Sequence, residues 1–128
     1  MKKSVLILTD GAPKTEKMAA DIAETLKGSK VLAKTASEFA GNDILPADAF
    51  FLGCENPDPE SFAYITDLLK HINLAGRSCG VFSPGTKKTA DYLAGLVKDC
   101  EAALNPELLT GTSPDIKNWA QNVINKIY

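Results

Sequence analysis

Short apolar segments alternate along this chain with longer segments in which apolar residues recur every three or four positions. The short segments are typical of buried β-strands, and the longer ones of helices with one apolar face. This alternation favours a parallel sheet, because each connection must cross back over the sheet and leaves a helix on one of its faces. We therefore expect an α/β fold in three layers. The strands are predicted at 5–8, 30–33, 49–52, 78–82 and within 101–110.

Four helices are predicted from apolar residues spaced to lie on one side of a helix. The first is expected to begin near Thr15. The segment 35–46 is too irregular for a long helix, although Ser37 is a suitable cap for a short one. The fifth strand is interrupted at Asn105-Pro106, where we expect a bend or a split. The four apolar stripes are Met18, Ala19, Ile22, Ala23 and Leu26; Phe62, Ile65, Leu69 and Ile72; Ala90, Leu93, Val97 and Cys100; and Ile116, Trp119, Val123 and Ile127.

Proline residues occur at or near the predicted helix starts. At the first helical position proline gives up only an N–H that has no helical acceptor, and three of the four prolines follow a residue that can cap a helix. We interpret the pattern as helix-start chemistry in rigid β-to-α turns. The pairs are Ala12-Pro13, Asp58-Pro59, Ser83-Pro84 and Ser113-Pro114.

The composition indicates a single domain over residues 1–128, since 45% of the chain is hydrophobic. A net charge of -2 leaves no basic face for nucleic acid. The first apolar run stops at Thr9-Asp10, too short for a signal sequence or a membrane span. Three cysteines without CxxC spacing suit a reducing compartment, and a single histidine leaves no zinc-site pattern. We expect a soluble cytoplasmic protein without a metal.

In folds of this kind ligands bind at the carboxyl ends of the strands, so the β-to-α turns are the informative segments. They lie within the stretches VLILTDGAPKTEKMA, ADAFFLGCENPDPESF, LAGRSCGVFSPGT and NPELLTGTSPDIKNWAQNVI. In these stretches the sequence resembles the flavodoxin-like superfamily, over essentially the whole chain. The resemblance implies a doubly wound five-stranded parallel sheet in the order 2-1-3-4-5. It also implies that flavin mononucleotide (FMN) lies across three loops at the strand ends and that the protein transfers electrons.

The resemblance assigns the cofactor to those three loops. In flavodoxins the first loop reads roughly (S/T)-x-T-G-x-T and wraps the phosphate with backbone N–H groups and hydroxyls. In the same register here, only Thr15 keeps a hydroxyl, Pro13 removes a donor and Asp10 adds a negative charge, whereas Lys14 and the helix N-terminus attract a phosphate. The implied cofactor-binding residues are Thr9, Asp10, Gly11, Ala12, Lys14 and Thr15 in the first loop, Gly53, Cys54, Glu55 and Asn56 in the second, and Ser83, Pro84, Gly85 and Thr86 in the third.

The second and third loops contain no aromatic residue to stack on a flavin ring. Phe62 lies on the apolar stripe of its helix, so we expect it in the core. Tyr92 lies about two turns into its helix, where it packs or faces solvent. The missing rings and the altered first loop predict that FMN binds less tightly than in flavodoxins with complete loops.

Cys54 is the cysteine best placed for chemistry, since it follows a central strand and precedes a helix whose N-terminus lowers a thiol pKa. Glu55 and Asp58 oppose a thiolate there. A reactive thiol and a buried structural cysteine are both open readings of Cys54, whereas Cys79 and Cys100 are expected in the core.

Other phosphate chemistries at the same edge fail on their motifs. The third strand does not end in the aspartate of a receiver domain, C-x5-R from Cys54 meets Glu60, and GAPKT lacks the spacing of a Walker motif. The resemblance implies a small electron carrier that holds FMN and exchanges electrons with a redox partner protein, rather than an enzyme with its own substrate. The alternative is a flavin-free module that binds a protein partner or a small anion. The sequence leaves the oligomeric state open.

Overall fold

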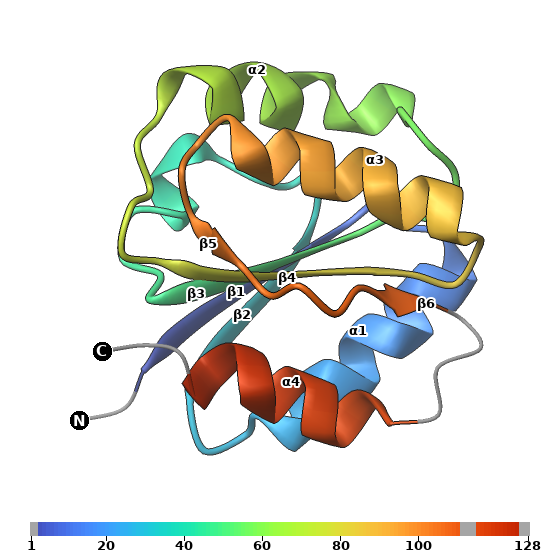
Figure 1. Ribbon diagram of the computed structural model, residues 1–128, viewed down its shortest axis with the longest axis vertical. Coiled ribbons are helices and arrows are strands. Elements are labelled where there is room, and N and C mark those ends of the chain that lie inside the picture. The colour runs from blue at the N-terminus through green and yellow to red at the C-terminus, as the bar shows by residue number, and fades with distance from the viewer. Residues whose placement is uncertain (1–2, 111–114, 126–128) are drawn as a thin grey trace.

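A parallel sheet lies between two layers of helices in the computed structural model, which describes residues 3–110 and 115–125 (Figure 1). Helices α2 and α3 cover one face of the sheet, and α1 and α4 cover the other. The strands are β1 (Ser4–Thr9), β2 (Lys30–Thr35), β3 (Ala49–Gly53), β4 (Ser78–Ser83), β5 (Ala103–Leu104) and β6 (Leu109–Thr110). The helices are α1 (Pro13–Thr25), α2 (Ala63–His71), α3 (Lys87–Lys98) and α4 (Ile116–Asn125), with 3-10 turns η1 (Gly41–Asp43) and η2 (Glu60–Phe62).

The strands pair in the order β2-β1-β3-β4-β5, and every pair is parallel. The predicted topology is therefore confirmed. The fifth strand forms as two pieces: β5 pairs with the start of β4, where Cys79 lies opposite Leu104, and β6 pairs with its end, where Phe82 lies opposite Leu109. The split falls at Asn105-Pro106, as predicted.

Hydrogen bonds to the sheet and to α4 hold the chain where the fifth strand is split. The Asn105 N–H still donates to the carbonyl of Cys79 at 2.8 Å, so the chain leaves β4 only after this residue. The carbonyl of Glu107 accepts from Asn105 Nδ2 at 3.3 Å and from Trp119 Nε1 at 2.7 Å. Pro106 has no N–H to lose from the ladder. The segment between β5 and β6 is therefore held by hydrogen bonds to β4 and to α4.

The strands on the predicted sheet run further than the sequence indicated, and the first helix begins earlier. β1 continues to Thr9 and β3 to Gly53, because these two residues lie opposite one another in the parallel ladder. α1 begins at Pro13, two residues before the predicted start at Thr15. The turn between β1 and α1 is consequently only three residues long.

Fewer of the turn prolines stand at the first position of a helix than their spacing suggested. Pro13 occupies the start of α1, which confirms the helix-start interpretation for the first turn. Pro59 directly precedes the 3-10 turn η2, which leads into α2, and Pro84 lies three residues before α3, so these two prolines lie near a helix start but not at its first position. In the part of the chain that the structure describes, no side chain caps η2 or α3. The pair Ser113-Pro114 lies outside the described residues.

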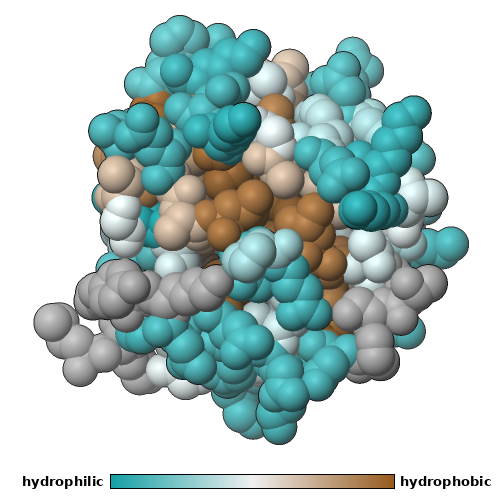
Figure 2. All heavy atoms as spheres, viewed as in Figure 1, coloured by the Kyte–Doolittle hydropathy of each residue, from teal (hydrophilic) through white to brown (hydrophobic). Residues whose placement is uncertain are grey.

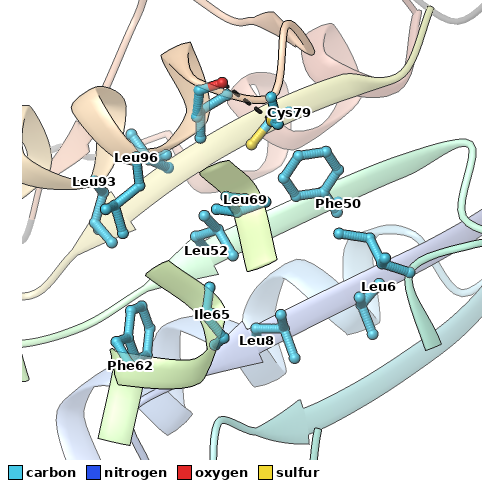
Figure 3. Close-up of a cluster of buried hydrophobic side chains, with 14 of the residues drawn as sticks. Leu6, Leu8, Phe50, Leu52, Phe62, Ile65, Leu69, Cys79, Leu93 and Leu96 are labelled. Atoms are coloured by element: carbon cyan, nitrogen blue, oxygen red, sulfur yellow. Dashed lines mark hydrogen bonds between the residues drawn. The ribbon is translucent and has the colours of Figure 1, made fainter. Parts of the chain in front are cut away.

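Two hydrophobic layers form because successive residues of a strand point to opposite faces of the sheet. Every described residue of the four predicted stripes is buried or partly buried, and Ile127 lies outside the described residues. Figure 3 shows the layer toward α2 and α3, which includes Leu6, Leu8, Phe50, Leu52, Phe62, Ile65, Leu69, Leu93 and Leu96. The layer toward α1 and α4 includes Val5, Ile7, Phe51, Phe82 and Trp119, whose indole meets both phenylalanine rings edge-on.

The connection between β2 and β3 contains no α-helix, which confirms that the segment is too irregular for a long one. Ser37 does not cap a helix; Glu38 instead accepts the N–H of Thr35 at 3.1 Å and closes a turn. β2 is therefore poorly covered on one face. Leu32 is 41% exposed, and a groove of about 360 Å³ lies beside it.

The other edge of the sheet carries an apolar surface of its own. Figure 2 shows this patch between the polar surfaces of the helices above and below it. It lies where β5 and β6 run, with Ala103 exposed and Leu104 and Leu108 half-buried. No helix among the described residues is long and apolar enough to cross a membrane.

Replacement of Trp119 by alanine should lower the free energy of unfolding by about 3–5 kcal/mol, because the change empties a core site and removes the bond to Glu107. Leu45→Ala, at a side chain that is 54% exposed, is the matched control and should change it by no more than about 0.5 kcal/mol. Urea denaturation followed by circular dichroism measures both. Equal losses in the two variants would contradict the packing described for α4.

Candidate functional site

Three turns meet at the carboxyl ends of the strands, on the right-hand side of Figure 1. Loop 1 (residues 10–12) joins β1 to α1, loop 2 (54–59) joins β3 to η2, and loop 3 (84–86) joins β4 to α3. β1, β3 and β4 are neighbours in the sheet, so the three loops are adjacent as well. The edge combines the N-termini of two helices with three short turns, which is where ligands bind in doubly wound sheets.

Side chains at the end of β1 hold loop 1 in place. Asp10 Oδ1 accepts the N–H of Ala12 at 3.1 Å, and Thr9 Oγ1 accepts the N–H of Gly11 at 3.3 Å. The Thr9 hydroxyl in turn donates to the carboxylate of Glu16 in the first turn of α1. Gly11 has a φ of 83°, a conformation that favours glycine. Loop 1 is thus closed by its own strand and helix.

Loop 2 is bonded to both of its neighbours through the backbone of Glu55. Its N–H donates to Asp10 Oδ2 at 2.9 Å, and its carbonyl accepts the hydroxyl of Thr89 in α3 at 3.4 Å. Gly85 of loop 3 packs so closely that a Cβ atom there would lie 2.5 Å from the Glu55 carbonyl oxygen. The N–H of Gly85 donates to Ser83 Oγ at 3.0 Å. The three loops therefore form one cross-linked unit.

The first turn of α1 offers polar groups that the protein itself does not use. No side chain among the described residues caps this helix, since Ala12 occupies the cap position and Pro13 follows it. Thr15 is fully buried, and its Oγ1 has no hydrogen-bond partner among the described residues. Lys14 beside it is exposed. An unpaired buried hydroxyl at a helix N-terminus is a strong potential donor to an anion.

Cys54 is a structural thiol and not a reactive one. Its side chain is fully buried in the core layer beneath α2 and α3. Burial, together with the nearby charge of Asp10, raises the pKa of this thiol to about 12. The expectation that the helix N-terminus favours a thiolate is overridden because the sulfur is withdrawn from water. Cys79 and Cys100 are also fully buried, as predicted.

The aromatic residues near the loops belong to the core. Phe62 is fully buried, as predicted. Tyr92 packs half-buried against the same layer, and burial raises the pKa of its phenol. Among the described residues, no group of His, Cys, Asp and Glu side chains is arranged to hold a metal ion.

Comparison with known proteins finds relatives by structure and not by sequence. No protein-family model and no curated protein matches the chain. A short-chain flavodoxin associated with a non-canonical PDU bacterial microcompartment superposes over 100% of both chains, with a TM-score of 0.84 and 19% identity. Flavodoxin 2 from Bacillus cereus covers 97% of this chain and 99% of its own, with a TM-score of 0.82 and 21% identity. The chain has the flavodoxin-like fold.

A further match is a variant of the Fusobacterium nucleatum flavodoxin bound to FMN, with a TM-score of 0.80 and 12% identity. It covers 100% of this chain and 99% of its own. These matches confirm the fold that the alternation of strands and helices and the resemblance predicted. The identities are too low to transfer the relatives' ligand-binding residues, which stay a prediction for this chain.

The flavodoxin-like fold brings the predicted site residues to one edge. Thr9, Asp10 and Gly11 lie in or next to a turn that contacts loop 2, and Gly85 contacts loop 2 from the other side. What sequence reasoning missed is the role of Asp10, which it treated only as a charge. The Asp-Gly pair after β1 was the available signal, since aspartate side chains commonly bond the backbone two residues on. Its bond to Glu55, 45 residues away, had no local signal.

The raised pKa of Cys54 predicts an alkaline loss of stability. An unfolded thiol ionises near pH 8.5, whereas the folded Cys54 keeps its proton until about pH 12. The unfolded state therefore releases protons first, and the free energy of unfolding falls as pH rises above about 8.5. In urea denaturation between about pH 8 and 11, the wild type should lose up to about 1.4 kcal/mol per pH unit more than Cys54→Ala. Parallel curves for the two proteins would contradict a buried, protonated Cys54.

Proposed function

We propose that this chain is a flavodoxin-like electron carrier that holds FMN across loops 1, 2 and 3. The observation that carries the proposal is the unpaired, fully buried hydroxyl of Thr15 at the uncapped N-terminus of α1. A buried hydroxyl without a partner costs about 1–3 kcal/mol, so a bound group that pairs with it recovers that energy. The full-length likeness to flavodoxins supports the same assignment.

The residues at the start of α1 fit the phosphate end of FMN. Thr15 Oγ1 donates a hydrogen bond, the Lys14 ammonium supplies a positive charge, and the first N–H groups of the helix point toward the anion. Pro13 reduces these N–H groups by one. The N–H groups of Gly11 and Ala12 are already bonded to side chains of the protein. The phosphate subsite is therefore present but smaller than a complete cradle.

Loops 2 and 3 fit the ring end through their backbones. When bound, FMN supplies a planar ring that takes up and releases electrons. The bonds of Glu55 to Asp10 and Thr89 fix the backbone of loop 2, and near its far end Asp58 has a φ of 51°, in the left-handed region. Loop 3 closes against loop 2 at Gly85. Cys54, beneath the loops, remains a neutral thiol and takes no part in the electron transfer.

A redox partner protein is the counterpart of a carrier of this kind, because a carrier passes on the electrons that its cofactor takes up. The second candidate function is a flavin-free module that binds a protein or a small anion. One observation favours it: the N–H groups of Gly11, Ala12, Glu55 and Gly85 all donate within the protein. Flavin binding by the purified protein separates the two functions.

Titration of the flavin-free protein with FMN, followed by flavin fluorescence, should give saturable binding with a micromolar dissociation constant. The affinity is limited because loops 2 and 3 offer no ring for stacking, and stacked aromatic pairs each contribute about 0.5–1.5 kcal/mol. Nanomolar binding would show that the backbone contacts alone grip the ring. No binding of FMN would overturn the proposed function in favour of the flavin-free module.

Thr15→Val tests the phosphate subsite, because valine keeps the shape of the side chain and removes the hydroxyl. The flavin-free variant should be more stable than the wild type by about 1 kcal/mol, since an unpaired buried hydroxyl has been removed. Its FMN affinity should fall about tenfold or more, because a bond to a charged group is lost. Riboflavin, which has no phosphate, should bind both proteins equally. A less stable variant would show that the hydroxyl has a partner within the protein.

A further inference from the structure

Among the described residues, Asp10 is the one carboxylate that bonds two loops of the site at once. Its Oδ1 accepts the N–H of Ala12 at 3.1 Å and its Oδ2 accepts the N–H of Glu55 at 2.9 Å. We infer that Asp10 is a specificity-determining positioning residue: it acts as an internal anion in loop 1 and removes most of the site's preference for a phosphorylated flavin over an unphosphorylated one. This inference rests on the proposed function and names the ligand class that the site accepts.

Asp10 and a phosphate compete for the backbone N–H donors of loop 1. An anion-binding turn works through backbone N–H groups that point at the ligand. In loop 1 the N–H of Ala12 already donates to Asp10, and that of Gly11 to Thr9. Both oxygens of the Asp10 carboxylate are engaged, and hydrogen bonds to an ionised acceptor are stronger than neutral ones. A phosphate can take the N–H of Ala12 only if Asp10 gives it up.

The charges around loop 1 also disfavour a phosphate. Residues 9–16 contain two carboxylates, Asp10 and Glu16, and a single cation, Lys14. Glu16 accepts the hydroxyl of Thr9 and so faces the same turn. A phosphate monoester carries a charge of about −1.5 to −2 at neutral pH, so it meets like charge on entering this turn. Riboflavin meets none, because its side chain ends in a neutral hydroxyl.

Asp10 also has a structural role, which explains why a carboxylate is present at a site for an anion. Its second bond reaches loop 2 across 45 residues of sequence and fixes Glu55, whose carbonyl is in turn held by Thr89. The same bond that positions loop 2 beside the ring therefore places a negative charge beside the phosphate.

The test compares FMN with riboflavin on the wild type and on Asp10→Asn. Asparagine keeps the shape and one acceptor oxygen but has no charge. The wild type should prefer FMN to riboflavin by less than about tenfold, and Asp10→Asn should bind FMN about tenfold more tightly with riboflavin changed less than about twofold. Asp21→Asn, which removes an exposed carboxylate further along α1, is the matched control and should leave both affinities unchanged.

A preference for FMN above about a hundredfold in the wild type, or an equal gain for both flavins in Asp10→Asn, would overturn the inference while leaving the proposed function intact. Inorganic phosphate provides a test that does not depend on the ring. A phosphate titration can be followed by the amide chemical shifts of Lys14 and Thr15. Phosphate should bind Asp10→Asn about tenfold more tightly than the wild type. Equal phosphate affinities would overturn the inference even if neither protein binds flavin. Asp10→Ser, which restores a hydroxyl in place of the carboxylate, should reproduce the gain if Asp10→Asn does not fold.

Discussion

Strands β1, β3 and β4 are buried on both faces, and the remainder of the architecture follows from this constraint. Leu6 and Leu8 point toward α2 and α3, while Val5 and Ile7 point toward α1 and α4. A strand with two apolar faces requires a helix layer on each side, and helical crossovers that return the chain to the same end of the sheet make successive strands parallel. Parallel strands end at one edge, so three consecutive β-to-α turns must meet there. The site is thus a consequence of how the core is covered.

The sequence predicted most of the fold because its signals are local. The apolar stripes of the helices and the interruption at Asn105-Pro106 can each be read within a few residues. The local pattern does not reveal contacts between distant segments, such as the bond from Asp10 to Glu55. It also does not reveal the effects of burial, such as the raised pKa of the Cys54 thiol. Both depend on which groups the sheet order brings together and on how far water is excluded, and neither leaves a trace in the local pattern. The turn at Ser37 was missed for a different reason: two residues close in sequence compete for its N–H groups, and Glu38 bonds the Thr35 N–H there.

Thr15 and Asp10 show opposite solutions to the same problem of polar groups at a crowded sheet edge. Most buried polar groups in proteins are paired, and an unpaired one is expected chiefly where it has a function. Asp10 satisfies neighbouring N–H groups and so stabilises the flavin-free protein. Thr15 leaves a hydroxyl unsatisfied and destabilises it. A bound group that paired with this hydroxyl would recover the energy that it costs.

The cross-linked loops also determine how binding energy is divided between the two ends of a ligand. A turn that is already held by its own hydrogen bonds loses little conformational entropy when a ligand arrives, and this preorganisation favours binding. The bonds through Glu55 and the close approach of Gly85 provide this preorganisation for loops 2 and 3. In loop 1 the hydrogen bonds that hold the turn occupy its N–H donors, which are the groups that a phosphate would need. Loops 2 and 3 are therefore organised in advance, whereas an anion at loop 1 would depend on the donors at the start of α1.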